Sequence, residues 1–266
     1  MIARQRAAHQ LLDDGQILSD PYALKILREG EQDLLQFASQ HPSASIGRLF
    51  TAARSRIAED ALSRAVEAGV RQIVGAGLDT FALRCPHGMR QLHLYEVDHP
   101  ATQAWKLHRL TEAQIPIPKS LSFVPVDFER DDLGEKRAAA GFLHSLPAFF
   151  TWLGVVPYLT EEAIGHTLAY ISSIPKSEVV FDYMESAEAF SEDLKQIERK
   201  RAEQLEKMGE RSATRFDPAA IAAILRSHGF LDIEDIDFHE IASKFGHSVK
   251  GLTPGHLGAH VVRAKH

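Results

Sequence analysis

Short apolar runs alternate with longer amphipathic stretches through the middle of the chain. Each run has the length of a strand, and the stretches between several of them have helical spacing. The runs are Val70–Val74, Leu92–Val97, Leu121–Val126, Ala148–Leu153 and Val179–Tyr183. The helical stretches are Pro100–Gln114, Asp132–Gly141 and Glu161–Ser173. Strands that alternate with helices predict βαβ units and a mostly parallel sheet.

The segment before this alternation is expected to be helical. Residues 1–46 are polar-rich, with a break at Asp20-Pro21 because proline disfavours helix in the residue before it. A long helix is predicted from about Gly47 to Ala68, since its apolar residues recur at helical spacing and Gly69 ends it.

The pattern changes after the fifth run. Residues 186–211 are charged and predicted to be helical. A solvated surface helix is favoured over a partner-binding one, although a place beside the carboxyl edge of the sheet also suits a lid over a substrate. A further helix begins at Asp217-Pro218, with aspartate as N-cap and proline at the first helical position. Two last strands are expected at Leu231–Ile236 and His260–Arg263.

The whole pattern predicts one α/β domain, because a chain of 266 residues can bury most of its apolar surface in a single core. We expect a doubly wound, mostly parallel sheet of seven strands. A helical N-terminal extension (1–46) and a helical lid insertion (186–211) complete this organisation of residues 1–266.

Composition excludes several classes of protein. The formal net charge of −6 gives no electrostatic reason to expect a nucleic-acid partner. No apolar run approaches the ~18 residues of a membrane span, and the polar N-terminal residues differ from a secretory signal. The single cysteine, Cys85, fits a reducing compartment and is interpreted as a packing residue. We therefore expect a cytoplasmic protein, either a monomer or a homodimer.

The first strand ends in a glycine turn, Gly75-Ala76-Gly77. Missing Cβ atoms let a ligand approach the backbone of such a turn. Thr80 occupies the place where a dinucleotide fingerprint carries its third glycine, which disfavours a pyrophosphate at the following helix. The turn is therefore more compatible with a cofactor that has an adenosine and no phosphates.

The next two strands end in acids, Asp98 and Asp127. A carboxylate at the end of the second strand can accept both hydroxyl protons of a ribose. Glu96 has the same chemistry two residues earlier, and the alternative role for Asp98 is a helix N-cap. Asp127 suits an adenine amino group, with loop capping as its alternative. A glycine and two aspartates at three strand ends along one edge are a more specific signal of a nucleoside site than any one of them alone.

The long helix carries two arginines, Arg54 and Arg56. A guanidinium grips the carboxylate of an amino-acid cofactor with two parallel hydrogen bonds. Residues two apart on a helix point in different directions, so only one of them is expected to reach the site.

These motifs together resemble the leucine carboxyl methyltransferase family, in particular its bacterial branch of S-adenosylmethionine-dependent methyltransferases. The runs that carry the resemblance are Ala53–Arg56, Gly75–Thr80, Tyr95–Gln103, Phe123–Phe128, Trp152–Thr160 and Phe216–Pro218. The resemblance implies a class I methyltransferase fold and S-adenosylmethionine as the cofactor.

The resemblance also assigns roles to residues. It implies that Arg54 holds the methionine carboxylate and that Gly75, with Ala76 and Gly77, packs against the methionyl part. Asp98 would bind the ribose, and Asp127 with Phe128 the adenine. Relatives often have an acid at Leu153, so the cofactor's ammonium group is expected to meet a backbone carbonyl there. Arg6 is a candidate second cation.

The methyl acceptor is a small molecule or a peptide, and an oxygen acceptor is favoured by the resemblance. A carboxylate needs no general base, whereas a phenol would benefit from one. His99 and Tyr158 are the acceptor-pocket candidates, since both lie at the carboxyl end of a strand. The other histidines lack metal-ligand spacing, so no metal is expected, and Trp105 and Trp152 are predicted to be core.

Two alternative functions stay open. A non-catalytic protein could keep S-adenosylmethionine as a structural ligand with the same residues. A nicotinamide-dependent oxidoreductase is disfavoured by the missing third glycine and by the absence of an obvious Tyr-x-x-x-Lys pair.

Overall fold

A computed structural model of the protein describes residues 2–27, 29–39, 44–75, 80–85, 92–127, 130–186, 195, 214–247 and 258–266. Three of the predicted site residues, Ala76, Gly77 and Phe128, lie outside the described residues. The predicted lid, 186–211, also lies outside them except for Ser186 and Lys195.

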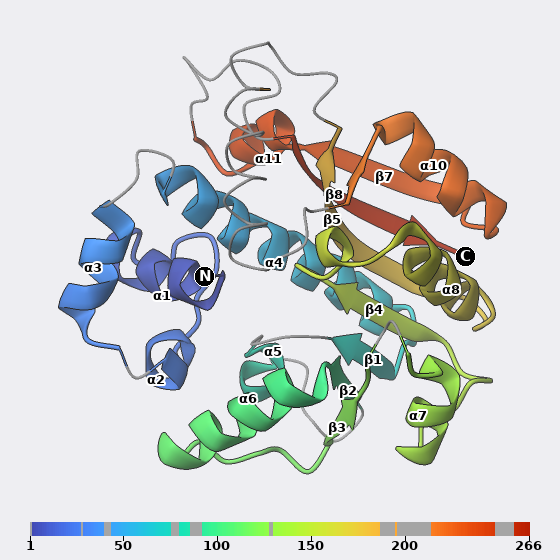
Figure 1. The fold of residues 1–266 in the computed structure, drawn as a ribbon, viewed down its shortest axis with the longest axis horizontal. Helices are drawn as coiled ribbons and strands as arrows, with labels where there is room; N and C mark the ends of the chain where they lie inside the picture. The colour runs from blue at the N-terminus through green and yellow to red at the C-terminus, as the bar shows by residue number, and fades with distance from the viewer. Residues whose placement is uncertain are drawn as a thin grey trace.

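One sheet forms the centre of the molecule (Figure 1). Its strands are β1 (Gln72–Gly75), β2 (His93–Asp98), β3 (Leu121–Pro125), β4 (Ala148–Trp152), β5 (Glu178–Glu185), β6 (Arg215–Phe216), β7 (Asp232–Asp237) and β8 (Ala259–Lys265). Their order is β3-β2-β1-β4-β5-β8-β7, with β6 paired to β5. Strands β1 to β6 pair in parallel, and β8 runs antiparallel to both β5 and β7. The mostly parallel α/β fold is confirmed.

The predicted number of strands was one too low, because β6 has only two residues and no periodicity to recognise. Its formation depends on tertiary contacts. Phe216 is buried with its ring edge-on to Tyr183, and its carbonyl accepts a hydrogen bond from the Ser186 N–H. The first strand also differs from the prediction, since it begins at Gln72 and includes Gly75.

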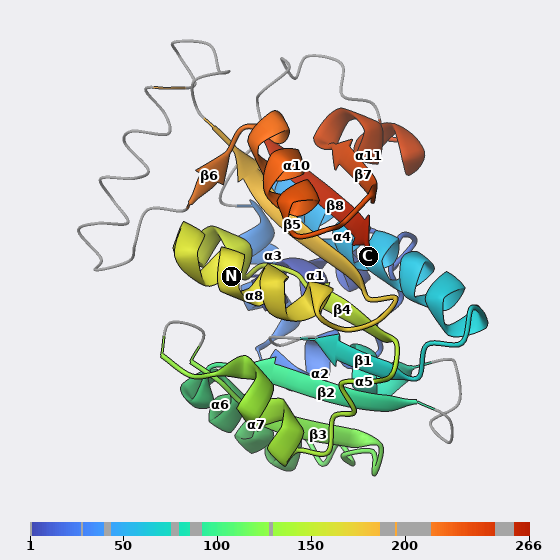
Figure 2. The same ribbon diagram turned by 90° about the vertical axis from the view of Figure 1, so that its right-hand side faces the viewer.

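Helices cover both faces of the sheet (Figure 2). Helices α7 (Leu133–Ala139), α8 (Glu161–Ser172) and α10 (Pro218–Ser227) pack on one face around a core that includes Val74, Phe150 and Phe181. Helices α4 (Ala44–Glu67), α5 (Phe81–Arg84) and α11 (Phe238–Lys244) pack on the other face, against Ile73, Phe149 and Val180. The alternation of these side chains follows from the two-residue period of a strand.

The N-terminal extension is helical, as predicted. It consists of α1 (Ile2–Leu12), α2 (Ala23–Leu27) and α3 (Glu31–Ser39), which gather beside one half of α4 (Figure 1). A separate apolar cluster joins Ala7, Ile26 and Leu34 of this extension to Leu110 of α6 (Pro100–Glu112). The extension is therefore anchored to the helix that follows β2.

Local signals at helix ends were read correctly. Asp217 is the N-cap of α10, accepting from the Ala219 N–H at 2.8 Å, and Gly69 adopts a φ of +104° after α4. The prediction for Trp105 was wrong: its side chain is 42% exposed, with Arg109 over its ring, because α6 buries a different face. Trp152 is buried as predicted.

Candidate functional site

The predicted site residues of β1, β2 and β3 lie at the carboxyl edge of the sheet. Gly75 pairs with Glu96, two residues before the end of β2. The Val126 N–H donates to the Asp98 carbonyl at 2.9 Å. Asp127 is the next residue, so it lies close to the end of β2. The register therefore brings the three strand ends together where doubly wound sheets bind ligands.

Gly75 has no room for a side chain. A Cβ at this position would lie 2.8 Å from Thr151 Oγ1 on the neighbouring strand β4. That distance is below van der Waals contact, so any other residue at this position would require the Thr151 side chain to shift.

Arg54 reaches the same edge from α4 and is held by Asp182 of β5. Arg54 Nη1 donates to Asp182 Oδ2 at 2.5 Å, and the Gly154 N–H donates to Asp182 Oδ1 at 2.5 Å. Both charged side chains are about 6% exposed. The carboxylate therefore fixes the guanidinium and the turn after β4 at once.

The backbone of Gly154 makes this arrangement possible. Its φ is +70°, a left-handed conformation that favours glycine. A Cβ there would lie 3.0 Å from Arg54 Nη2. Any side chain at this position would therefore press against the guanidinium.

The Nε of Arg54 is buried and has no hydrogen-bond partner within the described part of the chain. Because Asp182 occupies Nη1, the Nε side is the one that a carboxylate could grip in bidentate fashion. Arg56 points elsewhere and pairs with Asp60 at 2.8 Å, as the helical spacing predicts.

At the end of β2 the structure excludes one of the two roles considered for Asp98. The N-cap of α6 is His99, whose Nδ1 accepts from the Ala101 N–H at 3.2 Å, so the capping role for Asp98 is wrong. Asp98 Oδ1 accepts from the His99 N–H at 2.7 Å. Glu96 is buried in an ion pair with Lys106. Asp98 is thus the acid of β2 that lies at the edge.

Asp127 starts a tight turn after β3. Its N–H donates to Asp131 Oδ2 at 2.9 Å, and its carbonyl accepts from the Asp131 N–H at 2.8 Å. The hydrogen bond from Asp127 lowers the pKa of Asp131, as does nearby Lys136. The loop-capping side chain is therefore that of Asp131, and the Asp127 carboxylate lies 3.7 Å from the exposed Arg130.

The remaining candidates flank this centre. Leu153 is half-buried and packs on the face of the sheet that α4 covers. Tyr158 lies in the short 3-10 helix η1 (Val156–Tyr158), which follows β4, and it is 58% exposed. Arg6 is buried, with Nε 3.7 Å from Asp20 Oδ2. Asp20 also accepts from the Thr80 hydroxyl at 2.5 Å, which places Arg6 close to Thr80 at the start of α5.

Two buried polar groups escaped the sequence analysis. Asp182 lies inside the apolar run of β5, and an acid there signals a buried partner. On the other face of β5, the Tyr183 hydroxyl donates to Asp235 Oδ2 at 2.8 Å. Asp235 Oδ1 lies 2.9 Å from His260 Nδ1, in a cluster that no short-range spacing reveals.

Two features are absent from the described residues. Among them no helix is long and apolar enough to cross a membrane. Within the same residues, His, Cys, Asp and Glu side chains form no group suited to a metal ion.

The strand order defines the class, a doubly wound α/β protein in which the predicted site residues lie at the carboxyl edge of the parallel strands. A protein of the DUF574 family from Streptomyces avermitilis shares the fold, with a TM-score of 0.54 and 14% identity over 98% of this chain and 96% of that chain. The CurJ carbon methyltransferase has a TM-score of 0.50 and 15% identity over 99% and 65% of the two chains. At such identities the likeness shows the fold alone.

The chain belongs to the leucine carboxyl methyltransferase family, whose family model matches residues 1–172. It is 34% identical over 201 residues to the Bacillus subtilis protein named "Putative S-adenosyl-L-methionine-dependent methyltransferase YktD". That alignment covers 73% of this chain and 64% of YktD. A protein of the same description from Saccharopolyspora erythraea is 29% identical over 65% of this chain and 60% of its own length. The chain thus spans less than two thirds of these relatives.

Proposed function

We propose that the protein is an S-adenosylmethionine-dependent methyltransferase that methylates an oxygen, in a carboxylate or a hydroxyl, of a small molecule or peptide. Membership of the leucine carboxyl methyltransferase family supports methyl transfer. The names of its bacterial relatives support S-adenosylmethionine as the methyl donor.

The arrangement of Arg54 carries the proposal. A buried guanidinium whose Nε lacks a partner in the described chain is suited to an anionic ligand. The amino-acid end of S-adenosylmethionine supplies a carboxylate, and Asp182 holds the guanidinium in a fixed orientation. Preorganised hydrogen bonds of this kind reduce the entropy lost on binding.

The other roles follow the edge of the sheet. The glycine turn, Gly75, Ala76 and Gly77, would take the methionyl part, with the Leu153 carbonyl near the ammonium group. Asp98 would accept the ribose hydroxyl protons. Asp127 and Phe128 would take the adenine.

Bound S-adenosylmethionine supplies a methyl group on a positively charged sulfur. Transfer is an in-line displacement, so the protein acts mainly by aligning the acceptor oxygen, and positioning contributes most of the acceleration. Tyr158, exposed at the same edge, and His99 are proposed to line the acceptor pocket. His99 Nδ1 already accepts a backbone hydrogen bond, so its contact with an acceptor would use Nε2.

Incubation with methyl-labelled S-adenosylmethionine and a metabolite and peptide extract tests the proposal. Mass spectrometry should find a labelled product, and mild alkali separates methyl esters, which release methanol, from methyl ethers, which survive. Cofactor binding without labelled product in any extract would instead favour a non-catalytic binding protein.

A further inference from the structure

Buried polar side chains join α6, the helix that follows Asp98, to β2. Lys106 of α6 forms an ion pair with Glu96 of β2, and these two residues are only 2% and 6% exposed. Gln103, which is also buried, donates from Nε2 to the Glu96 carbonyl at 2.9 Å. Both contacts therefore end on one residue of β2, two positions before Asp98.

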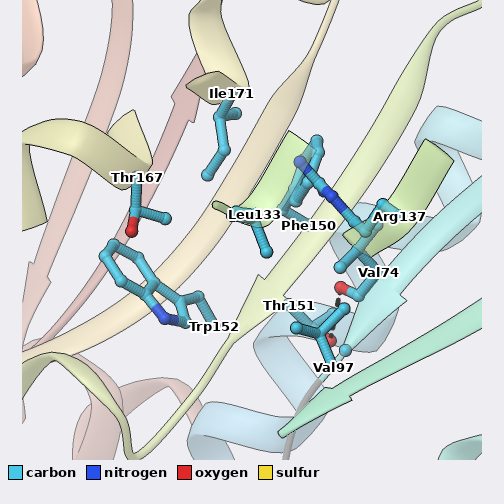
Figure 3. A pocket seen from close by; sticks show the side chains of 10 residues that line it. Val74, Val97, Leu133, Arg137, Phe150, Thr151, Trp152, Thr167 and Ile171 are labelled. Atoms are coloured by element: carbon cyan, nitrogen blue, oxygen red, sulfur yellow. Dashed lines mark hydrogen bonds between the residues drawn. The ribbon is translucent and has the colours of Figure 1, made fainter. Parts of the chain in front are cut away.

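Glu96 and Asp98 lie on the same face of β2, because side chains alternate along a strand. Val97, between them, is buried on the opposite face, where it lines a small cavity with Val74 (Figure 3). Asp98 Oδ1 accepts from the His99 N–H, and His99 caps the start of α6. The place of α6 on the sheet therefore sets the position of the peptide group that orients the Asp98 carboxylate.

The ion pair between Glu96 and Lys106 is not needed to stabilise the contact between the helix and the sheet. Removing both charges from water is unfavourable, and apolar side chains of similar volume often stabilise a buried contact as well or better. Glu96 Oε2 is buried without a hydrogen-bond partner in the described chain, which adds to the unfavourable part. What directional bonds add is a defined placement of α6 against β2, because they require particular distances and angles.

We propose that Glu96, Lys106 and Gln103 are positioning residues for the ribose of the cofactor: they hold the start of α6 so that the Asp98 carboxylate meets the ribose hydroxyls. This inference rests on the proposed function, because it takes S-adenosylmethionine as the ligand and Asp98 as the acceptor of its ribose hydroxyl protons. A displaced carboxylate loses hydrogen bonds to the diol, which weaken steeply away from their preferred distance and angle. The three residues act on the cofactor only through Asp98.

The test measures what the ribose hydroxyls contribute to binding by the whole protein. Calorimetric titration gives the ratio of the affinities for S-adenosylhomocysteine and for an analogue that lacks both ribose hydroxyls. In the wild-type protein this ratio should be at least about tenfold, because hydrogen bonds to a charged acceptor are strong.

The informative variant carries both Glu96→Leu and Lys106→Met, which replace the ion pair by apolar side chains. Its free energy of unfolding in urea should stay close to that of the wild type or rise. Its affinity ratio should fall to about threefold or less, because α6 no longer has a defined placement. Arg56→Met with Asp60→Leu, at an exposed ion pair of α4, is the matched control and should keep the wild-type ratio.

A double variant that keeps the wild-type ratio would overturn the inference and leave Glu96 and Lys106 with a purely structural role. If the double variant does not fold, Gln103→Met decides by the same ratio, since it keeps the ion pair and removes only the bond to the Glu96 carbonyl. A lowered ratio for Gln103→Met supports the inference, and an unchanged one overturns it.

The same titrations separate this inference from the proposed function. A wild-type protein that binds S-adenosylhomocysteine and its analogue equally well would overturn the positioning role and leave methyl transfer standing. A wild-type protein that binds neither ligand would contradict the proposed function, and the inference with it.

Discussion

Asp182 is the residue that organises the edge site. An ionised carboxylate inside an apolar strand is tolerated because both its oxygens accept charge-assisted or backbone hydrogen bonds. Its two donors come from α4 and from the turn after β4, so one side chain fixes the two walls of the site. The positions of Gly154 and Arg54 are therefore coupled through the Asp182 carboxylate.

Replacement of Gly154 tests this dependence. Gly154→Ala places a Cβ 3.0 Å from Arg54 Nη2 and forces alanine to a φ of +70°. We expect the left-handed backbone to cost about 1–2 kcal/mol of stability. We also expect affinity for S-adenosylhomocysteine to fall in calorimetric titration, because the guanidinium is displaced.

Gly141→Ala is the matched control for this substitution. Gly141 has a φ of +88°, and a Cβ added there would meet nothing within 4 Å, so this variant should lose similar stability without loss of ligand affinity. Equal affinities for the two variants would show that Gly154 does not shape the ligand site.

Asp98 provides a second test at this scale. Asp98→Ala removes hydrogen bonds to the ribose, each worth ~1.5–3 kcal/mol when the acceptor is charged. Affinity for S-adenosylhomocysteine should fall at least about tenfold, since ~1.4 kcal/mol is a factor of ten. His99 caps α6, so the thermal midpoint of the unliganded variant should change little. An unchanged affinity would remove Asp98 from the site.

Among the elements, the N-terminal extension and the start of α5 are joined by a buried polar network. Asp20, with its side chain fully buried, accepts from the Thr80 hydroxyl and from the Tyr22 N–H. Arg84 Nε donates to Thr80 Oγ1, and Arg84 also pairs with Glu59 of α4. The hydroxyl of Thr80 explains why the third glycine of a dinucleotide fingerprint is replaced here.

Thr80→Val keeps the shape of the side chain and removes the hydroxyl. The Asp20 carboxylate then loses a donor, which should lower the free energy of unfolding by ~1–3 kcal/mol in urea titration. Thr111→Val is the control, because the Thr111 hydroxyl bonds only to the carbonyl of Leu107 on the exposed side of α6. If both variants unfold alike, the hydrogen bond between Asp20 and Thr80 does not stabilise the fold.

The surroundings of His260, on β8, predict that the stability of the fold depends on pH. Burial acts to lower the pKa of His260, but Asp235, Glu185 and Asp237 raise it above its ordinary value. A raised pKa stabilises the fold fully below about pH 6.5, and this contribution is lost as the pH rises through the folded-state pKa. His260→Asn should therefore cost more stability at pH 5.5 than at pH 9.

The matching variant is His108→Asn, at a histidine whose side chain is 68% exposed. Its unfolding free energy should stay close to wild type at both pH values. A loss for His260→Asn that is equal at the two pH values would contradict the raised pKa.

For the whole molecule, periodicity was enough to predict the alternating elements and the edge of the sheet at which the predicted site residues lie. The prediction of Gly75, Asp98 and Asp127 as neighbours depended on parallel strands ending together, which the register bears out. Asp182 was missed because it forms its contacts with residues far away in the sequence. Likewise β6 and the exposure of Trp105 depend on which surfaces tertiary packing covers, which local patterns do not specify.

Calorimetric titration of the wild-type protein with S-adenosylmethionine, S-adenosylhomocysteine and NAD, repeated with Arg54→Lys, tests the central claim most directly. Lysine keeps the charge beside Asp182 but lacks the bidentate edge, and Arg56→Lys is the control. We expect binding of the first two ligands, little or none of NAD, and an affinity at least about tenfold lower for Arg54→Lys alone. Tight binding of NAD without any response to S-adenosylmethionine would contradict the account.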